Sequence, residues 1–150
     1  MTRVDFFHLT RSGLDKALPR LLEKVLKSGA RAVVQAGSKA RVEALNAHLW
    51  TYDDHGFLPH GSDADGHAER QPLWLTESDE NPNRAAILVL TDGARSDRIA
   101  DYERCLELFD GNDEAAVAEA RRRWAAYKEA GHTVTYFQQT ERGGWEERSS

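Results

Sequence analysis

The sequence predicts an α/β fold: a single three-layer domain in which helices flank a mostly parallel central sheet. Short apolar runs alternate with amphipathic segments over the first 50 residues, a pattern typical of β-α-β winding. The length of 150 residues suits one domain with a sizeable core. No internal repeat or linker interrupts the chain. We therefore expect one domain over 1–150, with a polar C-terminal tail from about residue 141.

The first 50 residues predict two strand–helix pairs. VDFFHL is a strand, and the helix after it is expected to begin at Ser12 and end at Gly29, with a stripe of leucines on one face. Pro19 is expected to kink this helix or to begin its main part. RAVVQAG is a buried strand, and SKARVEALNAHLW is a helix capped by Ser38.

The remaining elements are separated by turn-forming segments. Residues 51–70 are expected to be loop because they are rich in Asp, Gly and His. QPLWLT, AAILVLT and YERCLELF are strands, and AAILVLT is the central one because it is apolar throughout. DEAAVAEARRRWAAYKEA is a helix with acidic residues in its first turn and Gly131 at its end. TVTYFQQ is the last strand.

Composition limits the class of protein. The formal net charge is −5, which argues against holding nucleic acid by overall charge. Cys105 is the only cysteine, so a reducing compartment is expected, and its apolar surroundings indicate a buried structural thiol. No apolar run approaches the roughly 20 residues that span a bilayer. We expect a cytoplasmic protein that does not contact membranes.

The polar segment with several His and Asp residues raises the question of a metal site. DADG, from Asp63, begins like a calcium-binding loop, but the twelfth position is Trp74 instead of a bidentate Glu. The His spacings match no zinc motif. No Ser-His-Asp order or nucleophile elbow is present either. We expect a solvated acidic loop, no metal, no cofactor and no catalytic residue.

The Gly37-Ser38-Lys39 turn offers an alternative function. It lies between a strand and a helix N-terminus, where an α/β fold can hold an anion. A small nucleotide- or anion-binding enzyme is therefore the alternative. The turn matches neither the P-loop nor the Gly-x-Gly-x-x-Gly fingerprint, which favours a tight structural turn.

The late helix carries a stripe that is both basic and aromatic. Val117, Arg121, Trp124 and Lys128 are spaced i, i+4, i+7 and i+11, which places them on one face. One interpretation is that Trp124 packs on the sheet while the arginines are solvated. The other is a site for an acidic peptide with an apolar anchor, because Arg binds carboxylates bidentately. Stacking on single-stranded DNA is a third interpretation, which the net negative charge opposes.

The stretch LWTYDDHGFLPHG places four aromatic or apolar side chains in a predicted loop: Trp50, Tyr52, Phe57 and Leu58. Loops usually run over the surface and are polar. These side chains either cover the edge of a core or line a site for a partner.

LW…FLPHG, followed by a late strand and by FD…A…RWAAYKEAGHTVTYFQQ, resembles the chi subunit family of bacterial DNA polymerase III over nearly the whole chain. The resemblance implies a Rossmann-like fold with no catalytic role in DNA replication. It implies an adaptor that binds the acidic C-terminal tail, ending in Pro-Phe, of the single-stranded-DNA-binding protein. It also implies a link to the clamp loader through the psi subunit or another clamp-loader subunit, with DNA contacted only indirectly.

The resemblance also implies site residues. Arg121 matches the tail-binding arginine of the family, and Trp124 matches its aromatic partner. Trp50 and Phe57 match aromatic positions beside that pocket, with Pro59 shaping the loop. The aromatic loop and the late helix are therefore expected to wall one pocket.

Positive charge on the late helix is expected from residues specific to this chain. Family members can carry lysines where this chain has Val117 and Ala125. The residues expected to replace that charge or to support the site are Lys128, Arg122, Arg123 and Tyr127.

Overall fold

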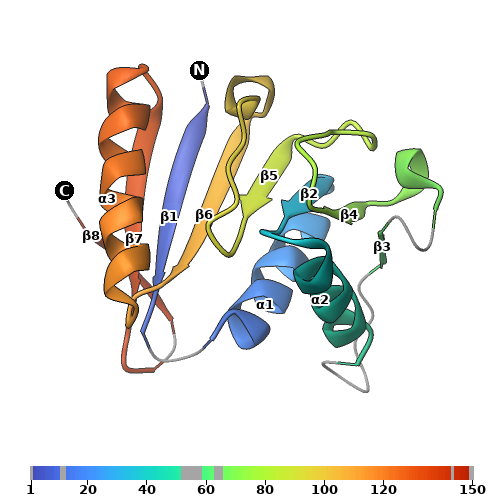
Figure 1. Cartoon of the computed structure of the whole chain (residues 1–150), viewed down its shortest axis with the longest axis horizontal. Coiled ribbons are helices and arrows are strands. Elements are labelled where there is room, and N and C mark those ends of the chain that lie inside the picture. The colour runs from blue at the N-terminus through green and yellow to red at the C-terminus, as the bar shows by residue number, and fades with distance from the viewer. Residues whose placement is uncertain (1, 11–12, 52–58, 63–65, 143, 149–150) are drawn as a thin grey trace.

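The computed structural model of the chain describes residues 2–10, 13–51, 59–62, 66–142 and 144–148. Within these residues the chain forms an eight-stranded sheet and three α-helices (Figure 1). The strands are β1 (Arg3–Leu9), β2 (Ala32–Gln35), β3 (His60–Gly61), β4 (Leu73–Thr76), β5 (Ile87–Leu90), β6 (Arg104–Asp110), β7 (Thr133–Gln139) and β8 (Trp145–Arg148). The helices are α1 (Leu14–Lys27), α2 (Lys39–Thr51) and α3 (Glu114–Glu129), with short 3₁₀ helices at Ala68–Arg70 and Ile99–Asp101.

The sheet is parallel except at one edge. Its strand order is β3-β4-β2-β5-β6-β1-β7-β8, and only β7 and β8 pair antiparallel. The apolar run of β5 is buried along its whole length between β2 and β6, as expected for a central strand covered on both faces. The predicted α/β fold with a mostly parallel sheet is confirmed.

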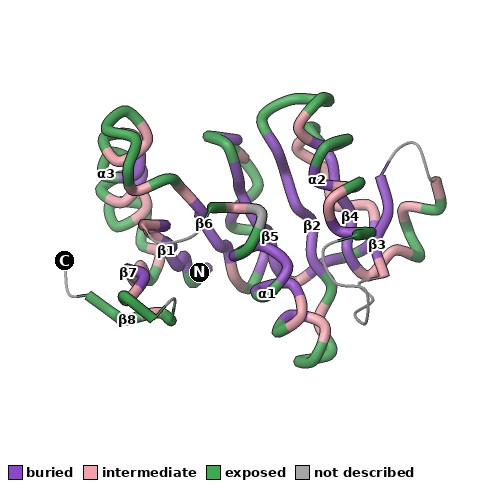
Figure 2. Tube along the Cα trace, turned by 90° about the horizontal axis from the view of Figure 1, so that it is seen from below, coloured by how far each residue is buried: buried purple, intermediate pink, exposed green. Residues whose placement is uncertain are grey.

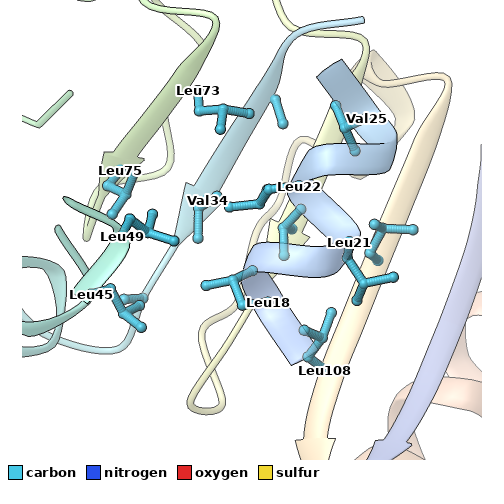
Figure 3. Packing of buried hydrophobic residues seen from close by; sticks show 14 of the residues in the cluster. Leu18, Leu21, Leu22, Val25, Val34, Leu45, Leu49, Leu73, Leu75 and Leu108 are labelled. Carbon is cyan, nitrogen blue, oxygen red and sulfur yellow. The ribbon is translucent and has the colours of Figure 1, made fainter. Parts of the chain in front are cut away.

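Apolar clusters lie on both faces of the sheet. On one face α1 and α2 pack together, and Leu18 and Leu45 are almost completely buried against strand residues such as Val34. Figure 3 shows the leucines of α1 and α2 gathered around β2. On the other face α3 covers a second cluster that includes Val4 and Phe6 of β1. Figure 2 shows the buried residues concentrated in the central strands.

The helices follow the predicted segments, with small differences at their starts. Gly13 is the N-cap of α1, which begins at Leu14, and the predicted cap Ser12 lies outside the described residues. Pro19 lies inside α1 on its buried side and does not begin the helix. Ser38 caps α2 as predicted, because its Oγ accepts a hydrogen bond from the Arg41 backbone N–H at 3.2 Å.

The last helix begins and ends as its sequence predicts. The Asp113 carboxylate accepts hydrogen bonds from the backbone N–H groups of Ala115 and Ala116, at 3.0 and 3.4 Å. Gly131 follows the C-terminus of the helix with a φ of 92°, which glycine adopts without strain.

The expected polar tail from about residue 141 needs correction. Residues 145–148 form β8, which adds an antiparallel edge strand to β7. Trp145 explains the pairing: its ring packs edge-on against Phe7 at 5.0 Å and joins the α1–α2 cluster. The sequence did not predict this strand because Trp145 is its single apolar residue and the other three residues are charged.

No helix in the described part of the chain is both long and apolar enough to span a bilayer.

Gly111 gives a stability prediction. A Cβ at this position would overlap the His8 imidazole and come within 2.8 Å of the Leu9 carbonyl oxygen. We expect Gly111→Ala to lower the free energy of unfolding by about 1–3 kcal/mol, the usual cost of overpacking. Gly144→Ala is the matched control, because its Cβ meets only Thr140 Oγ1 at 3.5 Å. Urea denaturation measures both variants, and equal stabilities would contradict the prediction.

Candidate functional site

A hollow of about 510 Å³ lies between α3 and the edge of the sheet. It is called the α3 pocket below, and it is lined by Phe109, Val117, Ala120, Arg121, Trp124, Tyr136, Gln138 and Arg148. The α3 residues among these are spaced i, i+3, i+4 and i+7, so they share one face of the helix. The structure thus brings Arg121 and Trp124 together in one pocket, as the sequence predicted.

Aromatic rings form the inner wall of the α3 pocket. Trp124 packs 5.5 Å from Phe6, which is buried, and 5.9 Å from Tyr136 in an edge-on arrangement. Phe109 lies 6.2 Å from Tyr136, measured between ring centroids. These separations are typical of favourable aromatic pairs. The wall is therefore apolar and fixed in position before any ligand binds.

Cationic groups surround this wall although the chain is acidic overall. Arg121 is exposed on α3, and the Arg148 side chain, on β8, has 53% of its surface exposed. The ammonium of Lys128 lies 5.5 Å from the centre of the Trp124 ring, within the range of a cation–π contact. An apolar wall with guanidinium groups beside it suits a ligand that is both aromatic and anionic.

His8 connects two walls of the pocket. Its Nδ1 lies at the Tyr136 hydroxyl, and its ring packs under Gly111 in the turn before α3. Burial lowers the pKa of His8 below its ordinary value of 6.5, and the positive charge of Arg121 acts in the same direction. Burial also raises the pKa of Tyr136. At neutral pH a neutral His8 therefore holds a neutral Tyr136 in the pocket wall.

Arg123 has a structural role, which corrects the expectation that it supplies charge to the site. It is buried, and its Nη1 donates to Glu107 Oε1 and to the Ala94 carbonyl oxygen, each at 2.8 Å. Its Nη2 donates to the Gly93 carbonyl oxygen at 2.7 Å. Burial raises the pKa of Glu107, and the Arg123 charge opposes that rise. Arg123 therefore fastens α3 to β6 and to the segment after β5.

Two predicted supporting residues face away from the α3 pocket. The Tyr127 hydroxyl donates to Glu107 Oε2 at 2.6 Å, so Tyr127 belongs to the buried network. Arg122 is highly exposed and pairs with Glu119. Both line a separate hollow of about 310 Å³ with Arg95 and Asp97. Neither is placed to touch a ligand in the α3 pocket.

The prediction that Trp50 shares this pocket is wrong. Trp50 ends α2, which packs on β4, and its ring lies 4.5 Å from His60 of β3. Those strands form the opposite edge of the sheet from β7 and β8 (Figure 1). Pro59 immediately precedes β3 at the same end, and Phe57 lies outside the described residues. Trp50 and Pro59 therefore lie at the end of the sheet opposite the late helix.

Sequence reasoning missed half of the pocket. Phe109, Tyr136, Gln138 and Arg148 come from three strands, and only the order of those strands brings them to α3. WEER carried little signal for a strand, because one apolar residue followed by three charged ones shows no apolar–polar alternation.

A larger hollow, of about 820 Å³, lies at the carboxyl ends of β1 and β6. The helices that follow these neighbouring strands lie on opposite faces of the sheet, which is where open α/β folds often bind ligands. Its lining includes three carboxylates, of Asp92, Asp110 and Asp113. Asp92 pairs with Arg41, and Asp113 caps α3. The negative charge of these three carboxylates repels a phosphate ligand.

The Gly37-Ser38-Lys39 turn lies beside the same aspartate. A Cβ on Gly37 would come within 3.0 Å of the Asp92 carbonyl oxygen, so a close backbone approach requires glycine here. The Asp92 carboxylate accepts from Arg41 Nε at 3.0 Å. These contacts support the structural interpretation of the turn over the anion-binding one. Among the described residues, no group of three or more His, Cys, Asp or Glu side chains gathers as a metal site would require.

Comparison with known proteins identifies relatives of the chain. The family model "DNA polymerase III chi subunit, HolC" matches residues 1–135. A "Probable DNA polymerase III subunit chi" of Rickettsia prowazekii is 34% identical over 105 residues, covering 68% of this chain and 64% of that protein. The "DNA polymerase III subunit chi" of Pseudomonas aeruginosa is 27% identical over 138 residues, covering 89% of this chain and 94% of that protein.

A solved structure resembles the fold alone. The C-terminal domain of the DEAD-box protein Dbp5 superposes with a TM-score of 0.54 at 12% sequence identity, covering 90% of each chain. The likeness supports the parallel α/β architecture.

The two neighbouring arginines of α3 give a second prediction. Arg123→Met leaves the buried Glu107 carboxylate without its cation, and we expect a loss of about 3–5 kcal/mol in the free energy of unfolding. Arg122→Met removes a solvated charge from the next position, and we expect a loss below about 1 kcal/mol. Chemical denaturation of both variants tests the difference, and similar losses would refute the structural role of Arg123.

His8 gives a prediction about pH. Because its folded-state pKa lies below 6.5, the unfolded chain binds the proton more readily, and this contribution to stability is lost as pH falls through 6.5. Between about pH 8 and 5.5 we expect the Tm of the wild type to fall more than that of His8→Gln. His67→Asn, at an exposed histidine, should follow the wild type. Parallel Tm curves for His8→Gln and wild type would contradict this assignment.

Proposed function

The chain belongs to the DNA polymerase III chi subunit family, and from that premise we propose that it is a non-catalytic adaptor of the bacterial replicative polymerase. In this proposal the α3 pocket binds the acidic C-terminal tail of the single-stranded-DNA-binding protein in the cytoplasm. The adaptor is linked to the clamp loader through psi or another clamp-loader subunit, and it reaches DNA only indirectly. The observation that carries the proposal is an aromatic wall flanked by Arg121 and Arg148.

The chemistry of the pocket matches a peptide that ends in Phe. In this proposal the terminal ring packs on the wall formed by Trp124 and Tyr136, beside Val117, and Arg121 binds the terminal carboxylate. Burying one Phe side chain contributes about 1.5–3 kcal/mol. A charge-assisted hydrogen bond contributes about 1.5–3 kcal/mol more. After the cost of ordering the tail and with further contacts, we expect roughly micromolar affinity.

An adaptor needs a second surface, and the α2 end of the sheet is suited to that role. Among the described residues Trp50 is the exposed large hydrophobic side chain, at 50% exposure. The helix that carries it, α2, lies at the opposite end of the sheet from α3 (Figure 1). We therefore assign Trp50 to contact with the clamp-loader side and not to the tail. Two partners bound at opposite ends of one sheet do not compete for space.

Peptide titration tests the tail assignment. Fluorescence anisotropy of a labelled acidic peptide ending in Pro-Phe is measured against wild type, Arg121→Ala and Trp50→Ala. We expect Arg121→Ala to weaken binding at least tenfold, or about 1.4 kcal/mol, because the terminal carboxylate loses its guanidinium. We expect Trp50→Ala to bind like the wild type. Binding should weaken with added salt, because the charged groups are solvated.

The two variants also separate the alternatives. Loss of binding in Trp50→Ala with none in Arg121→Ala would move the tail site to the α2 end. Absence of binding by the folded wild type at high concentration would refute the tail assignment altogether. A peptide in which Ala replaces the terminal Phe should bind none of the proteins and controls for non-specific charge attraction.

A further inference from the structure

A second hollow continues from the α3 pocket along the last two strands. Its volume is about 760 Å³, and it shares two lining residues, Gln138 and Arg148, with the α3 pocket. The residues that line it away from the shared pair are polar or charged, and they include Asn112, Arg142 and the carboxylates of Glu141 and Glu146. The two hollows therefore adjoin at Gln138 and Arg148, and together they are called the groove, with an apolar end and a polar end.

Strand pairing fixes the direction of Arg148. In the β7–β8 ladder Arg148 lies directly opposite Tyr136, and Glu146 lies opposite Gln138. Residues directly opposite each other in an antiparallel pair point to the same face of the sheet. Because Tyr136 faces α3, Arg148 does so too, whereas Trp145 points to the other face and packs on Phe7. The single apolar residue of β8 thus anchors the strand that presents Arg148.

Among the described residues, the ionic contact of Arg148 is with Glu146 and is weak. Its Nη2 lies 3.6 Å from Glu146 Oε2, too far for a hydrogen bond, and both side chains are more than half exposed. A solvated pair of this kind contributes between about 0 and 1 kcal/mol. Exchange of Glu146 for a ligand carboxylate therefore costs little. The same proximity means that Glu146 competes with any acidic ligand.

We propose that Arg148 is a specificity-determining residue that recognises an acidic side chain of the bound tail, N-terminal to its last aromatic residue. The polar hollow then holds the residues further upstream. This inference rests on the proposed function, because it requires the terminal Phe in the α3 pocket. An extended peptide advances about 3.3 Å per residue, so a tail anchored there passes Arg148 within a few residues.

Part of the groove lies beyond the segment that the family model matches. The family model matches residues 1–135, so Tyr136, Gln138 and Arg148 all follow the matched region. The anchor residues Arg121 and Trp124 lie within it.

The test compares two labelled peptides of about nine residues, which are long enough to span ~30 Å. Both end in Pro-Phe, and one carries Asp residues upstream where the other carries Asn. Anisotropy is measured with wild type, Arg148→Ala, Arg121→Ala and Glu146→Gln. Arg20→Ala, at an exposed arginine of α1, makes the same change in net charge away from the groove.

We expect Arg148→Ala to weaken the Asp peptide about tenfold and the Asn peptide less than about twofold, because only the Asp peptide loses a partner. Glu146→Gln should bind the Asp peptide about two- to threefold more tightly. Arg121→Ala should weaken both peptides, and Arg20→Ala neither. Arg148→Lys keeps the charge and should give an intermediate loss. Unchanged Tm values show that each variant keeps the global stability of the wild type.

The possible failures are distinguishable. If Arg121→Ala weakens both peptides while Arg148→Ala weakens neither, the proposed function stands and this inference is overturned. If Arg148→Ala weakens both peptides equally, Arg148 belongs to the anchor and does not read upstream residues, which also overturns it. If neither peptide binds the folded wild type, the proposed function fails and the inference fails with it.

Discussion

The buried ion pair between Arg123 and Glu107 fixes the position on which the α3 pocket depends. Arg123 reaches from α3 to β6 and to two backbone carbonyls after β5, so the helix cannot rotate or slide without breaking several charge-assisted hydrogen bonds. Arg121 lies two residues earlier, about 200° around the helix, and so points to the opposite side. One side of α3 is thus fastened to the sheet while the other side forms the pocket wall. A wall fixed in advance reduces the entropy cost of binding a flexible ligand.

The edge of the sheet supplies the other constraint. Without β8 the pocket would be an open step between α3 and β7, because Arg148 provides the wall at that edge. Trp145 holds the strand by packing on Phe7, and the pleat then directs Arg148 to the α3 face. A four-residue edge strand with three charged residues is also poorly suited to pairing with another chain, which protects the sheet edge from aggregation. The charges beside Trp145 therefore serve both solubility and the shape of the pocket.

The sequence was sufficient for local features and insufficient for neighbours that depend on strand order. Helical spacing alone placed Arg121 and Trp124 together, since residues three apart always share a helix face. Spacing could not show that Arg123 is buried, because the carboxylate that pairs with it belongs to a different element. Trp50 was assigned to the same pocket through the family resemblance, and residue spacing could not test that assignment, because strand order decides which elements are neighbours. Likewise, the place of Arg148 in the pocket follows only from its strand pairing with Tyr136.

Under the proposed function, the distance between the two ends of the sheet limits how the adaptor can couple its two proposed partners. The α3 pocket and Trp50 lie at opposite edges, with the buried strands β2, β5 and β6 between them. A close-packed interior resists small displacements, and distant sites without shared contacts usually behave independently. A tail bound at one end therefore has little means of changing affinity at the other. Coupling between the two partners then comes from tethering, because the first contact raises the effective concentration of the second. A rigid adaptor favours this mechanism over allostery, since allostery requires an element with two arrangements that both ligands bias.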